Sequence, residues 1–154
     1  MEGVLIMSNY SIWGEIQSVD HLCRGVRSVS TASHGGLMVS KGFAEKHIPK
    51  DVLANTPFEQ NCYQFEEDCS YSVPLMFKPT LIENMIRAWN PQSEGDDLLA
   101  RVKRSAACVY SAFIRYYPEY ANAYQSVVEE FKTYCKYTLN FNDAEMTDML
   151  NVNY

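Results

Sequence analysis

The sequence predicts an α+β fold, in which a small antiparallel sheet from the N-terminal half packs against about three C-terminal α-helices. The hydrophobic pattern has a period of two residues in the first half and of about 3.6 residues after Pro79. A length of 154 residues fits a single domain. With 47% hydrophobic and 21% charged residues, the chain has the composition of a protein that folds by itself. We expect a strand-rich half at residues 12–78, a helical half at 79–137 and a tail at 138–154.

Three runs in the first half favour antiparallel strands, at residues 13–19, 25–31 and 37–40. Apolar and polar residues alternate in the first two runs, which is typical of strands with one buried and one solvated face. A fourth strand is predicted for residues 71–77, which are rich in strand-forming side chains. Pro74 cannot donate a backbone hydrogen bond, so it restricts that strand to a sheet edge or a bulge.

One short helix is expected inside the strand-rich half. Ser40 is a suitable N-cap for a helix at residues 42–47, and Pro49 ends that helix. A loop is then expected as far as about residue 61.

Apolar residues after Pro79 recur at spacings of three and four residues, which predicts amphipathic helices. The first of these helices ends at residues 90–91, and the second runs up to Pro118. Pro118 starts a third helix, so the second and third form either an antiparallel pair or one sharply kinked rod. In the tail, residues 142–145 can cap one terminal turn, and a frayed or partner-docked tail is the alternative.

The net charge of −6 argues against direct binding of nucleic acid, because neutralising phosphates requires clustered lysine and arginine residues. The one basic cluster, Arg101, Lys103 and Arg104, fits a solvated helix face, with a phosphate contact as the alternative. If the chain binds a macromolecule, a basic protein surface is the expected partner. Eleven tyrosines also favour a binding protein, because tyrosine is large and amphipathic.

The sequence predicts a cytoplasmic protein that does not enter a membrane. Its longest apolar stretches are far shorter than the roughly 18–20 residues that cross a bilayer. The N-terminus lacks the basic region and the long apolar core of a secretory signal. Five cysteines form an odd set without a CxxC pair, which indicates reduced thiols rather than a disulfide scaffold or a zinc ribbon.

Three short segments stand in order: Trp-Gly at residues 13–14, Thr-Ala-Ser-His-Gly-Gly at 31–36 and Phe-Glu-Glu-Asp-Cys-Ser-Tyr at 65–71. Over residues 12–78, their order and spacing resemble an uncharacterised domain family of bacterial, plasmid and phage proteins with the pattern W-G, T-x-S-H-G-G and Y-E-E-D-C-x-W. The first and last residues of the third segment, Phe and Tyr, stand where that family has Tyr and Trp. The resemblance implies a mobile-element setting, and hence the cytoplasm of a bacterial host cell, but no reaction.

The first candidate site comprises Ser33, His34, Gly35 and Gly36, at the end of a predicted strand. The two glycines allow positive φ angles and let a ligand approach backbone N–H groups. An imidazole beside them could polarise a phosphate or carbonyl oxygen, or act as a general base. The alternative is a hairpin or bulge in which His34 bonds a nearby carboxylate.

The second candidate site is the run Glu66, Glu67, Asp68 and Cys69. In an extended segment, Glu66 and Asp68 share one face, while Glu67 and Cys69 share the other. Glu67 or Asp68 beside His34 would form a carboxylate–imidazole dyad, and such groups can also bind a divalent metal. Cys69 beside His34 would be a candidate nucleophile. The alternative is a solvated acidic turn.

Two classes of function fit these observations. The preferred one is a phage- or mobile-element-encoded protein, without metal or cofactor, that binds and inhibits or modulates a host protein or protein complex, as anti-defence and anti-CRISPR proteins do. Its binding surface is expected to include both motifs together with Tyr71. The alternative is a small hydrolase or ligand-binding protein that uses His34 with Glu66, Glu67 or Asp68. A homodimer is compatible with either class.

Overall fold

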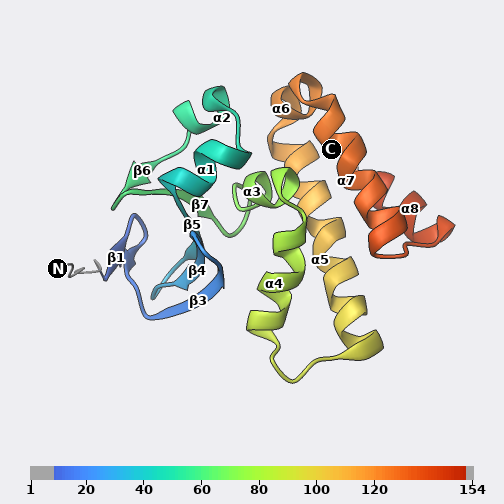
Figure 1. The fold of residues 1–154 in the computed structure, drawn as a ribbon, viewed down its shortest axis with the longest axis horizontal. Coiled ribbons are helices and arrows are strands. Elements are labelled where there is room, and N and C mark those ends of the chain that lie inside the picture. Colours follow the sequence, from blue (N-terminus) through green and yellow to red (C-terminus); the bar gives the residue numbers. More distant parts are fainter. Residues whose placement is uncertain (1–8, 152–154) are drawn as a thin grey trace.

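The computed structural model describes residues 9–151 and places a strand-rich part beside a bundle of helices (Figure 1). Helix α4 (Thr80–Trp89) stands between the sheet and the long helix α5 (Gly95–Tyr116), and helix α8 (Asp143–Leu150) lies at the far end. The predicted α+β class, with antiparallel strands in the N-terminal half and helices in the C-terminal half, is confirmed. Within residues 9–151, no helix combines the length and the apolar character needed to span a membrane.

The main sheet is antiparallel, and a short hairpin precedes it. Its strand order is β3-β4-β5-β7-β6, so β3 and β6 are the two edges. The five strands are β3 (Ser18–Cys23), β4 (Val26–Ser30), β5 (Gly35–Ser40), β7 (Cys62–Glu66) and β6 (Phe58–Glu59). The hairpin consists of β1 (Tyr10–Ser11) and β2 (Gly14–Glu15).

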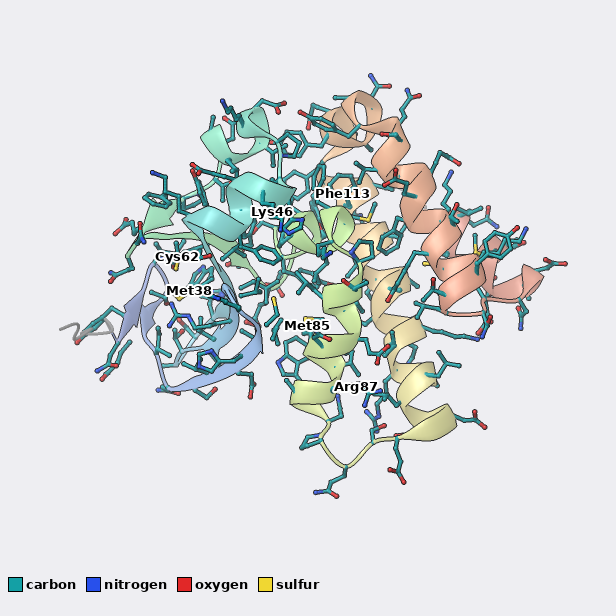
Figure 2. All side chains as sticks on the ribbon, viewed as in Figure 1. Met38, Lys46, Cys62, Met85, Arg87 and Phe113 are labelled. Atoms are coloured by element: carbon teal, nitrogen blue, oxygen red, sulfur yellow. The ribbon has the colours of Figure 1, made fainter. Side chains whose placement is uncertain are left out.

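Side chains along the strands alternate between two faces of the main sheet. Leu37 lies opposite Phe65 in the ladder, and both are buried in the main core on the side of the helices, which we call the helix face. The other side, which we call the Trp13 face, carries a small cluster of Val29, Met38 and Cys62 packed against Trp13 and Ile16. Figure 2 shows Met38 and Cys62 among the strands, far from Phe113 in the helical bundle. The three central strands β4, β5 and β7 therefore contribute residues to two separate environments.

Two of the predicted strands in the first half are confirmed, because residues 25–31 contain β4 and residues 37–40 belong to β5. The run at residues 13–19 is wrong as a single strand. Gly14 has a φ angle of 121°, and the run divides between β2 and the start of β3. Strand β3 then continues to Cys23, beyond the predicted end.

Residues 71–77 contain helix α3 (Ser72–Phe77), so the fourth strand predicted there is wrong. Pro74 lies in the first turn of this helix, where its missing N–H would have no partner within the helix. Residues 72–76 are all buried, and a short apolar run of this kind looks the same in a buried helix and in a buried strand. The neighbour of β5 in the sheet is instead β7.

Helix α1 (Lys41–His47) confirms the short helix predicted after Ser40. The Ser40 hydroxyl accepts a 3.3 Å hydrogen bond from the backbone N–H of Phe43, which caps the start of the helix. The loop predicted after Pro49 is wrong in part, because Pro49 is also the N-cap of helix α2 (Lys50–Ala54) and strand β6 follows.

The helices on either side of Pro118 form an antiparallel pair (Figure 1). Tyr110 and Phe131 stack with their ring centroids 6.2 Å apart, which joins α5 to the returning segment. That segment is α6 (Pro118–Ala123), α7 (Gln125–Thr133) and the π-helix η1 (Tyr134–Thr138). Residues 9–151 hold eight α-helices rather than about three, because the returning segment is broken and short helices flank the predicted ones.

The tail forms α8 and packs on α5. Asn142 and Glu145 make a capping box, in which each backbone N–H donates to the other residue's side chain at 2.8 Å, so the predicted cap is confirmed. Nζ of Lys103 lies 3.1 Å from Oε1 of Glu145, and Met149 is buried. As far as residue 151, the tail therefore docks within this chain instead of fraying.

Two hydrogen bonds fasten α4 to the sheet. The Asn84 side-chain amide donates to the Leu22 carbonyl at 3.1 Å, and the indole N–H of Trp89 donates to the Ser28 hydroxyl at 3.2 Å. They fix the end of α4 beside the helix face of β3 and β4.

Candidate functional site

The turn between β4 and β5 places the first predicted motif at the surface. The hydroxyl of Thr31 donates to the His34 carbonyl at 2.6 Å and accepts from the His34 N–H at 3.1 Å, so Thr31 closes the turn. Ser33 and His34 are both exposed. The backbone N–H of His34 already has a partner, so it is not free to bind a ligand.

Gly35 and Gly36 belong to β5, and neither has a positive φ angle. A Cβ atom on Gly36 would collide with the Phe65 carbonyl and with the Trp13 indole, and one on Gly35 would collide with the Val29 carbonyl. The two glycines therefore allow close packing of the strands and of Trp13, rather than the positive-φ turn that their sequence permits.

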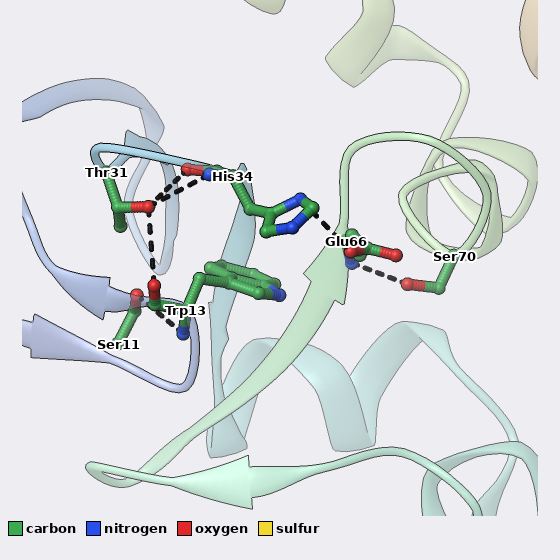
Figure 3. Close-up of polar contacts among 6 residues, drawn as sticks. All are labelled: Ser11, Trp13, Thr31, His34, Glu66 and Ser70. Atoms are coloured by element: carbon green, nitrogen blue, oxygen red, sulfur yellow. Dashed lines mark hydrogen bonds and ion pairs between the residues drawn. The ribbon is translucent and has the colours of Figure 1, made fainter.

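His34 pairs with Glu66 on the Trp13 face. Nδ1 of His34 lies 3.5 Å from Oε2 of Glu66, and the indole of Trp13 lies beside the imidazole (Figure 3). The backbone N–H of Glu66 donates to the Ser70 hydroxyl at 2.5 Å, which holds the end of β7. The two side chains are 51% and 36% exposed, so their pairing contributes at most about 1 kcal/mol to stability. The carboxylate beside the imidazole is thus that of Glu66, and not that of Glu67 or Asp68, with which the dyad was expected.

Glu67 and Asp68 lie elsewhere. Strand β7 ends at Glu66 and the chain turns over residues 67–70, so the four residues of the acidic run are not extended. The Glu67 N–H donates to the Gly35 carbonyl at 2.9 Å, and the Glu67 carboxylate lies over Gly35 on the helix face. There Glu67 and Asp68 line a pocket.

Cys69 is directed away from His34. The hydroxyl of Tyr117 donates to its thiol at 4.0 Å, and the hydroxyl of Ser72 donates to its carbonyl at 2.7 Å. Burial, followed by the nearby thiol, raises the pKa of Tyr117 above its usual range. Cys69 therefore belongs to the contact between the turn and the end of α5, and the structure does not bring it to His34.

The pocket on the helix face has a volume of about 480 Å³ and lies beside the edge strand β3. We call it the serine–acid pocket. Its walls come from β3, β4, β5, the turn after β7, and α4. Its lining consists of Ser18, Asp20, Ser28, Ser30, Gly36, Leu37, Glu67, Asp68, Tyr71, Met85 and Trp89. The hydroxyls of Ser18 and Ser30 are hydrogen-bonded to each other across β3 and β4.

Sequence reasoning missed seven of the eleven residues that line this pocket. The alternation of Ser28 and Ser30 assigns both to one strand face, which was the available signal, but it does not indicate a cavity. Ser18 and Asp20 belong to β3, whose extent was not predicted. The spacing of apolar residues after Pro79 places Trp89 on the apolar stripe of its helix, whereas in the structure Trp89 is 48% exposed and lines the pocket.

The serine–acid pocket is anionic. Asp20, Glu67 and Asp68 line it, and none of them forms an ion pair with another described residue. Burial raises the pKa of Tyr71 to about 12, with smaller contributions from Cys108 and Asp68, so its hydroxyl stays protonated at neutral pH. The pocket thus combines uncompensated negative charge with hydroxyl groups and two aromatic rings.

The structure separates the groups that the sequence suggested as metal ligands. His34 lies on the Trp13 face, while Glu67 and Asp68 line the pocket on the helix face. Among residues 9–151, no three or more His, Cys, Asp or Glu side chains gather in a way that could hold a metal ion.

A family model for a domain of unknown function, DUF7007, matches residues 6–146. The chain belongs to this family. The match includes both motifs, every residue of the serine–acid pocket and all of the helical half, so it extends well beyond the resemblance over residues 12–78. The detailed motif and the distribution among bacteria, plasmids and phages stay predictions. No curated protein and no solved structure matches the chain.

Proposed function

We propose that this protein is a non-enzymatic binding protein that recognises a partner protein through the serine–acid pocket and Trp89. The observation that carries the proposal is a fixed, half-exposed indole at the margin of an anionic pocket. The residues involved come from both halves of the chain, so the fold assembles a surface that neither half has alone.

Trp89 has the properties of an interface anchor. Its side chain is 48% exposed, and its N–H is held by the buried Ser28. A large aromatic side chain that is already fixed loses little conformational freedom when it is covered by a partner. Tryptophan is also enriched among the residues that contribute most to protein–protein binding.

The charge of the pocket favours a basic partner. Asp20, Glu67 and Asp68 have no cationic partner among the described residues, and the whole chain carries a net charge of −6. Complementary charge accelerates association and disfavours partners of the wrong sign. The same charge opposes binding to phosphate backbones.

For the identity of the partner, we propose a protein machine of a bacterial host cell, which this chain inhibits or modulates as the product of a phage or other mobile element. This part of the proposal is supported by the resemblance over residues 12–78 and by the small, acidic, tyrosine-rich chain. An anti-defence role, such as inhibition of a CRISPR complex, is the form we expect it to take.

Affinity capture from bacterial lysate, followed by reconstitution with the purified partner, tests the proposal. Baits are the wild-type chain, Trp89→Ala, and Tyr137→Ala as a control that removes a 69% exposed aromatic in η1. We expect one partner to form a stoichiometric complex with the wild type and the control, and to bind Trp89→Ala about tenfold or more weakly. A partner that is insensitive to Trp89, or the absence of any reconstituted complex, would contradict the proposal.

A second candidate function is favoured by the contact of His34 with Glu66 at 3.5 Å, because a carboxylate beside an imidazole can orient it as a general base. In that case the chain is a small hydrolase or ligand-binding protein. Hydrolysis of p-nitrophenyl acetate and p-nitrophenyl phosphate by the wild type, lost in His34→Ala and reduced in Glu66→Gln, would support it. Equal background rates for all three proteins would exclude it for these substrate types.

A further inference from the structure

We infer that the serine–acid pocket is a receptor for one arginine side chain of the partner. This inference rests on the proposed function and names the chemical group that the pocket recognises. It follows from the shape of the pocket, its acceptors and its aromatic rings, each of which points to the same class of ligand.

The pocket has the size of a ligand site rather than of a packing defect. Its volume of about 480 Å³ lies within the range of roughly 300–1,000 Å³ that is usual for small-ligand pockets. Leu37 and Met85 give it apolar surface from the sheet and from α4. Such a cavity accepts a long side chain whose stem is apolar and whose end is polar.

The polar groups of the pocket are mainly hydrogen-bond acceptors. Three carboxylates on the helix face provide oxygen atoms that only accept, from Asp20 on the edge strand β3 and from Glu67 and Asp68 in the turn after β7. The serine hydroxyls on β3 and β4 add further oxygen atoms. Guanidinium carries five N–H donors in one plane and no acceptor, so it matches this arrangement better than an ammonium group with three.

The aromatic residues favour the same cation. Trp89 and Tyr71 both line the pocket, and Tyr71 stays neutral at physiological pH. A guanidinium stacks on an indole or phenol face and gains from the ring quadrupole. An anionic ligand would meet three carboxylates without a compensating cation, and a wholly apolar ligand would leave these carboxylates without partners.

NMR titration of the folded protein with N-acetyl-L-arginine amide tests the inference. The sequence has two tryptophans, and they lie on opposite faces of the sheet, so the indole N–H signal of Trp13 is an internal control for that of Trp89. We expect the Trp89 signal to shift with a Kd of about 1–10 mM, because a single side chain gives only weak binding by itself. The Trp13 signal is expected to stay in place.

Two comparisons make the test specific. N-acetyl-L-citrulline amide has nearly the same shape without the charge, and N-acetyl-L-lysine amide has the charge without the planar fork; we expect both to bind about fivefold or more weakly. The double variant Glu67→Gln/Asp68→Asn should lose binding by a similar factor, whereas Glu59→Gln, an exposed acid on β6, should retain it. Near-identical thermal unfolding of the variants would show that they are folded.

The inference is overturned if arginine amide leaves the Trp89 signal unchanged up to about 50 mM, or if citrulline amide or lysine amide binds equally well. Either result would leave the proposed function standing, provided that the captured partner still depends on Trp89. Conversely, arginine binding without any Trp89-dependent partner would support the pocket chemistry and remove the proposed protein-binding function.

Discussion

Glu66 and Glu67 are adjacent in the sequence, yet they lie on opposite faces of the sheet and in different electrostatic surroundings. On the Trp13 face, Glu66 pairs with His34 at 3.5 Å beside a packed indole. On the helix face, Glu67 lines a pocket whose acids make no ion pair among the described residues.

The comparison shows that two glutamates can have different roles, one paired within the chain and one available to a ligand. A carboxylate that is paired within its own chain has already satisfied its charge and has less to offer a ligand. Carboxylates that line a pocket without a cationic partner among the described residues keep their acceptor oxygens available to a ligand. The contrast therefore directs the search for function to the helix face.

The largest effect on stability is expected at Gly36, which packs against Trp13 and the Phe65 carbonyl. Gly36→Ala should lower the free energy of unfolding by about 3 kcal/mol, because the new methyl group would displace Trp13 and the Phe65 carbonyl. Urea unfolding measures this. Gly42→Ala, a helical site where a Cβ meets nothing within 4 Å, should instead stabilise by about 0.5–1 kcal/mol. Equal effects at the two sites would show that Trp13 does not require the bare backbone.

A smaller effect on the free energy of unfolding is expected at alkaline pH, and it comes from Tyr71 on the helix face. The folded protein raises the pKa of Tyr71 from 10.0 to about 12, so the folded state holds this proton more tightly than the unfolded chain. The resulting stability is complete below pH 10 and is lost as the pH rises from 10 towards 12. Between pH 9 and pH 11.5, the wild type should lose about 1–2 kcal/mol more than Tyr71→Phe.

Urea unfolding at the two pH values checks this prediction. Tyr116→Phe is the control, because Tyr116 is 53% exposed and should change the pH dependence little. A Tyr71→Phe variant with the alkaline profile of the wild type would contradict a buried Tyr71 hydroxyl in the pocket wall.

The smallest effect compares the neighbouring acids directly. Glu66→Gln should lower stability by about 0.5 kcal/mol at neutral or mildly acidic pH, because it removes the partner of His34. Glu67→Gln should leave stability unchanged or raise it slightly, because it relieves repulsion with the other pocket acids, and it should weaken binding of the partner. Thermal unfolding measures the change in stability, and titration with the partner measures the change in binding. A larger stability loss for Glu67→Gln would mean that this acid has a structural partner after all.

Local signals in the sequence predicted much of the fold. Ser40 caps α1, and Asn142 with Glu145 caps α8, because capping depends on residues only three positions apart. The helix after Pro79 could also be predicted, because its apolar stripe is long enough to show the 3.6-residue period of a helix. Residues 72–77 were wrongly assigned to a strand because the segment is too short for its periodicity to decide between the two forms.

The candidate site was less predictable. The dyad was expected between His34 and Glu67 or Asp68, but the turn after Glu66 sends these two acids to the other face and leaves Glu66 beside the imidazole. Ser28 and Trp89 are 61 residues apart and meet only through the packing of α4 on the sheet. No periodic or local pattern records such a contact, because it depends on how two elements are oriented in space.

The contact of Trp89 with Ser28 affects how firmly the sheet and the helical bundle are held together. Because the walls of the pocket are shared between the strands and α4, anything that occupies it ties the sheet to the helical bundle. A bound side chain would then reduce local opening between the sheet and the helices. Backbone amide hydrogen exchange should slow at Asn84 and Leu22, where α4 meets β3, as well as at the pocket itself.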